Sequence, residues 1–200
     1  YKDNPTEANL RKVFTSKKDF KELPVLKFLL TSHCNLNCKG CSHFAPLVKE
    51  PSFLPFEQYK RELDRMKELF EDIRLISLLG GEPLMNKDLS KMVIYAREQF
   101  QYAMIEIITN GILFTKMEES FYDILKKTNT TVFISKYKST GDLVDKVEEK
   151  LKEENITYGI WTYQSDFYKR YSINENRHPE CAFKTCNERI CHTINNGKLA

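Results

Sequence analysis

The sequence predicts an α/β protein built as a partial (β/α) barrel of parallel strands, with a small Cys-rich C-terminal extension. Three observations predict this fold. Short apolar runs of strand length recur, amphipathic helix patterns separate them, and the alternation stops after Trp161. Strands that alternate with helices form parallel sheets with right-handed crossovers. The 200 residues suit one domain with a small appendix.

The predicted strands are short, β-leaning apolar runs, and the predicted helices carry apolar residues on one face. The strands are expected at residues 25–31, 73–79, 104–109, 131–135 and 156–161. The helices between them are expected at residues 56–70, 89–100, 117–125 and 143–151. Thr115 and Glu118 also have the spacing of a capping box, which marks the start of the third helix.

The chain divides into three expected segments. Residues 1–22 form a polar N-terminal segment, residues 23–161 the barrel core and residues 162–200 the Cys-rich extension. In the extension, Asn-Gly at 196–197 favours a type I′ turn, so residues 194–199 resemble the first half of a hairpin. Its second strand is expected beyond Ala200, which predicts that the chain is truncated there.

Composition and charge exclude several classes of protein. The chain is 41% hydrophobic, which excludes a disordered or collagen-like protein. A net charge of +3 gives no reason to expect nucleic acid or an acidic membrane as a partner. No apolar run approaches the ~20 residues of a membrane helix. The first twenty residues have no apolar core typical of a signal peptide, so we expect a cytoplasmic protein.

Three cysteines follow the first predicted strand at once, in the spacing C-x3-C-x2-C: Cys34, Cys38 and Cys41. Three thiolates on one loop can hold three irons of a [4Fe–4S] cluster and leave the fourth iron open. A zinc site with His33 or His43 as the fourth ligand is an alternative, and so is a disulfide with one spare thiol.

Gly80-Gly81-Glu82-Pro83 ends the second predicted strand, downstream of this Cys loop. Together the two motifs resemble the radical S-adenosylmethionine (SAM) superfamily, over roughly residues 23 to 161. The resemblance implies an enzyme that cleaves SAM reductively at a [4Fe–4S] cluster. The resulting 5′-deoxyadenosyl radical then takes a hydrogen atom from a substrate. No catalytic side chain is assigned.

The resemblance also implies particular site residues. Cys34, Cys38 and Cys41 match the cluster ligands, and Gly80 to Pro83 match the segment that binds the SAM amino group. Two further polar residues at strand ends match positions near SAM, and they are Asn110 and Ser135. One departure is Gly40, where family members often carry an aromatic residue near the adenine. His43 or Phe44 could take over that contact.

Three later cysteines are Cys181, Cys186 and Cys191. With the Gly-containing hairpin after them, they resemble the SPASM and twitch extensions of radical SAM enzymes. That resemblance implies an auxiliary iron–sulfur cluster whose fourth ligand lies past Ala200. Zinc remains an alternative for this set, because thiolates suit both metals.

The substrate expectation rests on the family alone. A peptide or protein substrate leads, followed by a dehydrogenase or epimerase acting on a carbohydrate or other small molecule. An activating enzyme that makes a glycyl radical on a partner protein would share the first Cys set, and a non-catalytic zinc or iron–sulfur module would need no SAM. An electron donor such as flavodoxin or ferredoxin is an expected partner. Aromatic residues around Trp161 are expected to pack in the barrel wall or to line the substrate cleft.

Overall fold

A computed structural model describes residues 22–163, 178, 180–181, 184, 186, 190–195 and 197–199. In this part of the chain one sheet has the strand order β5-β4-β3-β2-β1-β6-β7. The strands are β1 (Glu22–Leu29), β2 (Asp72–Leu79), β3 (Met104–Thr109), β4 (Thr130–Tyr137), β5 (Tyr158–Tyr163), β6 (Cys191–Asn195) and β7 (Lys198–Leu199). The helices are α2 (Phe56–Leu69), α3 (Leu89–Gln99), α4 (Glu119–Lys127) and α5 (Gly141–Glu153).

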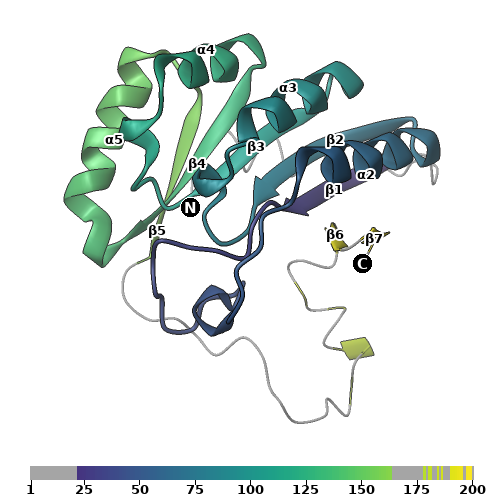
Figure 1. Ribbon diagram of the computed structural model, residues 1–200, viewed down its shortest axis with the longest axis horizontal. Coiled ribbons are helices and arrows are strands. Elements are labelled where there is room, and N and C mark those ends of the chain that lie inside the picture. The colour runs from purple at the N-terminus through teal and green to yellow at the C-terminus, as the bar shows by residue number, and fades with distance from the viewer. Residues whose placement is uncertain are drawn as a thin grey trace.

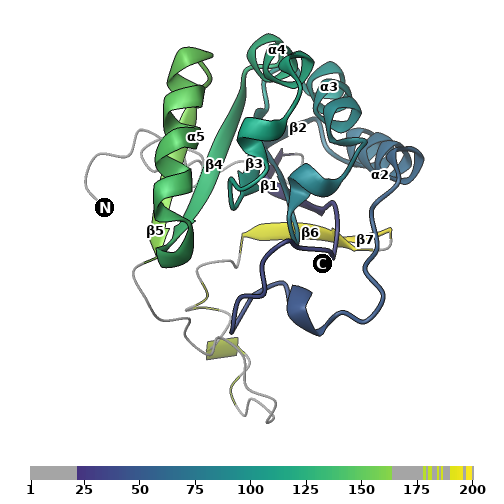
Figure 2. The same cartoon turned by 60° about the vertical axis from the view of Figure 1, so that its left-hand side comes forward.

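The predicted alternation of strands and helices is confirmed. All five predicted strands and all four predicted helices form, and their ends differ from the expected ones by no more than three residues. Strands β1 to β5 pair in parallel along the sheet. The four helices cover one face of this open, curved sheet, as a partial (β/α) barrel requires (Figures 1 and 2).

The hydrophobic core lies between that sheet face and the helices. Alternate residues of each strand point to the same face, so Leu26 and Phe28 of β1 lie in the core beside Ile76 and Leu78 of β2. The helices add their apolar sides, including Leu63, which is fully buried. The amphipathic pattern in the sequence therefore packs against the sheet as expected.

The end of the chain differs from the prediction. β6 pairs in parallel with β1, and β7 pairs antiparallel with β6 through Ile194 and Leu199. The expectation that the second hairpin strand lies beyond Ala200 is therefore wrong, because Lys198–Leu199 already form it. Gly197 has a φ of 73°, which suits the left-handed conformation of such a turn.

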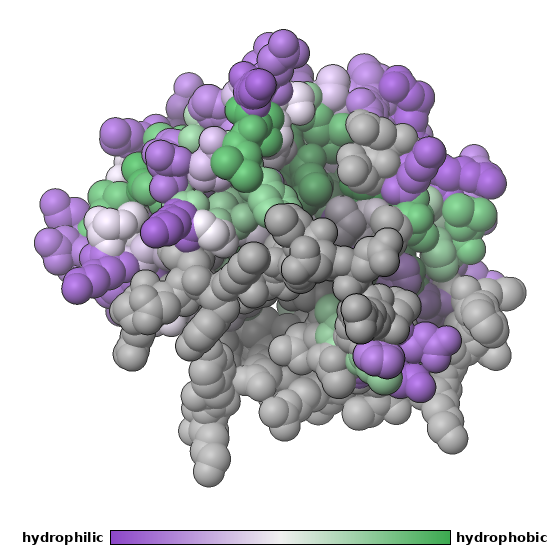
Figure 3. Space-filling view, turned by 90° about the horizontal axis from the view of Figure 1, so that it is seen from below, coloured by the Kyte–Doolittle hydropathy of each residue, from purple (hydrophilic) through white to green (hydrophobic). Residues whose placement is uncertain are grey.

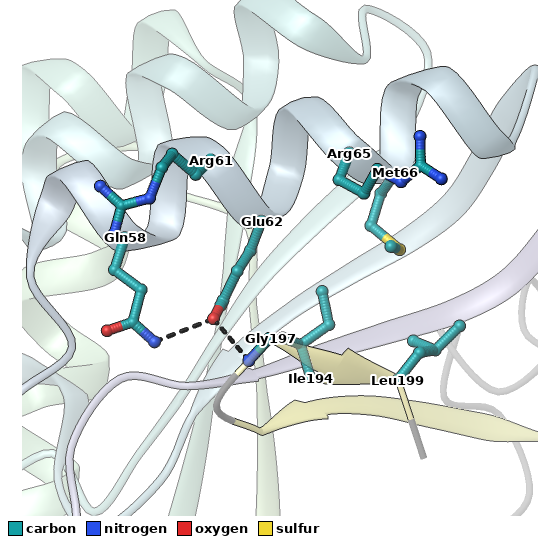
Figure 4. A pocket seen from close by; sticks show the side chains of 8 residues that line it. All are labelled: Gln58, Arg61, Glu62, Arg65, Met66, Ile194, Gly197 and Leu199. Atoms are coloured by element: carbon teal, nitrogen blue, oxygen red, sulfur yellow. Dashed lines mark hydrogen bonds between the residues drawn. The ribbon is translucent and has the colours of Figure 1, made fainter.

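Contacts with α2 hold this hairpin in place. The Gly197 N–H donates a hydrogen bond of 3.0 Å to the Glu62 carboxylate, which also accepts one of 2.9 Å from the Gln58 amide (Figure 4). A groove of about 330 Å³ lies between the helix and the hairpin. The hairpin thus extends the barrel sheet at its β1 edge.

The start of the third predicted helix is also different. Thr115 lies in a short 3₁₀ helix (Phe114–Lys116), and α4 begins after Glu118, which makes no side-chain cap. The capping-box prediction is wrong because tertiary contacts decide the local structure. The Phe114 side chain is fully buried against Phe121 and Tyr122.

The described surface carries both hydrophilic and hydrophobic side chains. In the view from below, hydrophilic side chains line the upper margin, with hydrophobic ones between them (Figure 3). Among the described residues, no helix is both long and apolar enough to cross a membrane. Of the predicted N-terminal segment 1–22, all but Glu22 lies outside the described residues.

Candidate functional site

The residues predicted to bind the first cluster and SAM gather at the carboxyl-terminal edge of the parallel strands. Cys34, Cys38 and Cys41 lie on the loop after β1, Gly80 to Pro83 follow β2, and Asn110 follows β3. Ser135 lies in the second half of β4 and is 7% exposed. Because these strands are parallel, their carboxyl ends meet at the same edge, where α/β proteins place ligand sites.

The two glycines allow close contact between two backbone segments. The Gly81 N–H donates to the Thr31 carbonyl at 2.7 Å, and the Glu82 N–H donates to the His33 carbonyl at 2.8 Å. A Cβ atom on Gly81 would lie 2.0 Å from the His33 carbonyl oxygen. A Cβ on Gly80, whose φ is 139°, would lie 2.5 Å from the carbonyl oxygen of Thr31. The segment after β2 is thus fastened to the chain that leads into Cys34.

Glu82 joins this segment to the end of β3. Its buried carboxylate accepts hydrogen bonds from the Thr109 hydroxyl at 2.6 Å, the Asn110 N–H at 2.9 Å and the Leu84 N–H at 3.0 Å. Burial raises the pKa of Glu82, while these hydrogen bonds oppose that change. The carboxylate therefore holds the segment after β2 to the end of β3, while the Glu82 N–H holds the same segment to the chain after β1.

Asn110 reaches from β3 to the Cys loop. Its side-chain amide donates a 2.7 Å hydrogen bond to Asn35 and lies 3.9 Å from the Cys34 sulfur. Its side-chain oxygen accepts from the Ile112 N–H at 3.0 Å, which fixes the turn after the strand. The structure thus brings Asn110 next to the first cysteine.

The cysteines of the first set carry thiols and are half-buried. Burial raises the pKa of Cys34, and the hydrogen bond from the Leu36 N–H partly opposes this. Burial also raises the pKa of Cys38, and the nearby Cys34 and Cys41 raise it further. Because the pKa of each of these two thiols is raised, both are protonated near neutral pH. Metal binding must therefore displace their protons.

The chemistry of this set fits an iron–sulfur cluster. A cubane binds one thiolate on each of three irons, so the thiols need not converge on one point. No group of three or more His, Cys, Asp or Glu in the described part of the chain has an arrangement suited to one metal ion. The three thiols on one loop can bind separate irons and leave the fourth iron to a ligand.

One cysteine of the second set, Cys191, lies away from the first Cys loop. Cys191 begins β6 and is paired with Val25, near the start of β1, six residues before Thr31. At about 3.3 Å per residue, this places it roughly 20 Å along the sheet from the first Cys loop. Cys181 is exposed and Cys186 half-buried. Their joint use as ligands stays a prediction.

The proposed aromatic replacements for Gly40 lie beside the site. Phe44 is 48% exposed, in a left-handed conformation with a φ of 54°, so it is not a core residue. His43 borders a pocket of about 250 Å³, together with Thr31, Phe53 and Gly80. This pocket opens between the Cys loop and the ends of β1 and β2.

One supporting residue, Asn86, was not predicted from the sequence. It is 4% exposed, and its amide donates to the Leu30 carbonyl at 2.9 Å and the Leu54 carbonyl at 3.0 Å. These bonds join the segment after β2 to the end of β1 and to the far end of the Cys loop. An Asn three residues after Gly-Glu-Pro resembles an ordinary turn residue, so the sequence carries no signal for this role.

Solved structures share the fold. BtrN in complex with AdoMet and 2-DOIA aligns with a TM-score of 0.57 at 21% identity, covering 74% of this chain and 58% of that chain. Streptococcus suis SuiB bound to S-adenosylmethionine aligns with a TM-score of 0.57 at 24% identity, covering 82% of this chain and 41% of that chain.

Curated relatives match in sequence. Fe-coproporphyrin III synthase of Methanosarcina barkeri is 37% identical over 90 residues, 45% of this chain and 22% of that protein. GTP 3′,8-cyclase of Staphylococcus carnosus is 29% identical over 112 residues, 54% of this chain and 33% of that protein. The chain thus spans between about a fifth and a third of the length of these relatives.

The family comparison covers the site itself. The Radical SAM superfamily matches residues 28–136, a range that includes the first Cys set, Gly80 to Pro83, Asn110 and Ser135. Members of this family use a [4Fe–4S] cluster and SAM. Because the match extends over more than half of the 200 residues, the chain belongs to the radical SAM superfamily.

Proposed function

We propose that this chain binds a [4Fe–4S] cluster through Cys34, Cys38 and Cys41 and cleaves SAM reductively. With an electron from a donor such as flavodoxin or ferredoxin, the cluster and SAM supply a 5′-deoxyadenosyl radical for hydrogen abstraction from a substrate. One observation carries the proposal. The Cys loop, the segment after β2 and the end of β3 are joined by hydrogen bonds at Gly81, Glu82 and Asn110.

The chain's own residues position the reactants. The segment from Gly80 to Pro83 offers backbone groups beside the Cys loop for the amino group of SAM. Glu82 is fully buried and has three hydrogen bonds, so it supports that segment and is not exposed to a ligand. Asn110 and Ser135 place polar side chains at the ends of the next two strands for the rest of SAM.

We propose a peptide or protein as the substrate, with a carbohydrate or other small molecule as the alternative. Among the fold relatives, SuiB was solved with its precursor peptide SuiA and anSMEcpe with a Cp18Cys peptide, whereas BtrN was solved with 2-DOIA.

We further propose that residues 23–161 form the radical SAM core and residues 162–200 an auxiliary-cluster extension. In that extension the ligands would be Cys181, Cys186 and Cys191, with an iron–sulfur cluster preferred over zinc.

The test is anaerobic turnover. The chain is reconstituted with iron and sulfide, reduced and mixed with SAM, and 5′-deoxyadenosine is measured. Cys38→Ala should abolish product, because two thiolates cannot hold the site-differentiated cluster. Ser42→Ala, an exposed position in the same loop, is the matched control and should keep product. Equal product from Cys38→Ala and the wild type would refute the assignment.

A further inference from the structure

A row of polar side chains crosses the sheet face opposite the helices. Lys27 of β1 is in register with Ser77 of β2, Ser77 with Glu106 of β3, and Glu106 with Thr131 of β4. Each has at least one neighbour in sequence that belongs to the helix-covered core, so these four point to the other face. Adjacent strands lie about 4.8 Å apart, so the four side chains form a continuous row.

The centre of this row is buried and incompletely hydrogen-bonded. Ser77 is fully buried and Glu106 is 5% exposed. The Ser77 hydroxyl makes no hydrogen bond of normal geometry within the described part of the chain, although it lies near the Glu106 carboxyl. Buried polar groups are nearly always hydrogen-bonded, and leaving one unpaired costs free energy. The Ser77 hydroxyl therefore has unused capacity to bind a polar group.

The electrostatics of Glu106 agree with this geometry. Burial raises its pKa to about 7, while the Ser77 hydroxyl and the positive charge of Lys27 oppose the rise. Near neutral pH the carboxyl group is therefore present in both protonation states. It accepts hydrogen bonds when ionised and can donate one when protonated.

The mixture of donors and acceptors selects the chemistry of the ligand. An ammonium group only donates and would be repelled by Lys27, while a carboxylate only accepts and would be repelled by ionised Glu106. A hydroxyl group donates one hydrogen bond and accepts two, so it can pair with Ser77 and with either form of Glu106. Of these three groups, the alcohol is the one that can pair with both Ser77 and Glu106.

The surroundings of the row suit a substrate rather than SAM. Asn110 lies four residues beyond Glu106 along the chain, or roughly 13 Å at the rise of a strand. Two residues beyond Thr131 on β4, toward the carboxyl ends of the strands, Phe133 stacks on Trp161 with ring centres 4.7 Å apart. This aromatic pair lies on the same face. Phe133 is buried, and the half-buried Trp161 offers an apolar surface to a molecule whose hydroxyl reaches Glu106.

We propose that Lys27, Ser77 and Glu106 form a substrate subsite that binds an alcohol group inside the partial barrel. The inference rests on the proposed function, because that function makes the bound molecule the substrate. A hydroxyl could come from a small polyol or from a serine side chain, and the experiment separates these sources.

The test measures binding of defined probes to the reconstituted, SAM-bound chain by saturation-transfer NMR. The small-molecule arm compares myo-inositol with its hexa-O-methyl ether. The peptide arm compares acetyl-Ala-Ser-Ala-amide with acetyl-Ala-Ala-Ala-amide. We expect one hydroxylated probe to bind at least tenfold more tightly than its partner, and the arm in which this occurs identifies the source.

Variants then assign the binding to the row. Glu106→Met and Ser77→Ala should each weaken the preferred probe at least tenfold. Glu106→Gln, which keeps an acceptor and a donor, should restore most of the affinity. Thr128→Val is the matched control, since Thr128 is equally buried but hydrogen-bonds to the Ile124 carbonyl at the end of α4. That variant should bind like the wild type.

The outcomes separate the two proposals. Production of 5′-deoxyadenosine by the wild type, with no preference for either hydroxylated probe, would refute the subsite and leave the proposed function intact. A lack of 5′-deoxyadenosine would refute the proposed function, whatever the probes show. Equal binding by the wild type and Ser77→Ala would also overturn the subsite. Ser77→Ala removes only one oxygen, so it tests the row even if Glu106→Met fails to fold.

Discussion

Replacement of Gly81 by alanine tests the joint between the Cys loop and the segment after β2. The added Cβ would lie 2.0 Å from the carbonyl oxygen and 2.5 Å from the carbonyl carbon of His33. Both are backbone atoms, so the clash cannot be relieved by rotating a side chain. One of the two segments has to move, and this movement disturbs the chain immediately before Cys34.

The cost follows from what that movement breaks. Two backbone hydrogen bonds join the segments, from Gly81 to Thr31 and from Glu82 to His33. Each is worth about 1 kcal/mol in net stability. Forcing a methyl group into a packed site adds about 1 to 3 kcal/mol. The Gly81→Ala variant should therefore lose about 3 to 5 kcal/mol of unfolding free energy.

Urea denaturation followed by circular dichroism measures this loss, and iron content after reconstitution reports on the Cys loop. Gly141→Ala is the matched control, because its Cβ would meet only the Lys136 side chain at 3.8 Å and its backbone is already helical. That control should be unchanged or up to about 1 kcal/mol more stable. If Gly81→Ala unfolds like Gly141→Ala and keeps its iron, backbone crowding is not why glycine is needed there.

Three further predictions concern other parts of the molecule. Cys186→Ala should lower bound iron by the content of one cluster, measured by iron and sulfide analysis, and loss of all iron would contradict two separate sites. Thr109→Val removes one donor to the buried Glu82 carboxylate and should cost about 1 to 3 kcal/mol in urea denaturation; an unchanged midpoint would contradict that role. The pKa of Glu106, which faces Lys27, is raised from 4.5 to about 7, so the folded state holds this proton while the unfolded state loses it. Wild-type stability should thus fall by about 3 kcal/mol between pH 4.5 and 7 relative to Glu106→Gln, and parallel pH profiles would contradict the raised pKa.

Periodicity predicted most of the fold. The apolar runs and helix patterns are local, and local patterns decide which elements form when tertiary contacts agree with them. A hairpin half was predicted at residues 194–199, but the start of β6 at Cys191 and its parallel pairing with β1 were missed. Cys191–Asn195 mixes polar and apolar residues and follows no predicted crossover helix. Its place beside β1 depends on contacts with Val25 and Phe28, which are distant in sequence.

The candidate site was predictable only as a set of positions. Spacing and placement after strands located the first Cys set and the Gly-Gly-Glu-Pro segment. They did not show that Glu82 points into the protein toward Thr109, or that Asn86 holds the end of β1. Those roles depend on the distances between the ends of β1, β2 and β3. A single sequence does not predict these distances.

The structure gives the Gly-Gly-Glu segment a second role beside any contact with SAM. Gly80 and Gly81 are required where the backbone after β2 touches the backbone after β1, and Glu82 extends the connection to β3. A substitution there would move the Cys loop even if no ligand were bound. Loss of activity in such a variant is therefore not proof of lost SAM contact, and only a stability measurement beside the activity assay separates the two causes. For the same reason Gly81→Ala is paired with Gly141→Ala, and iron content is measured apart from turnover.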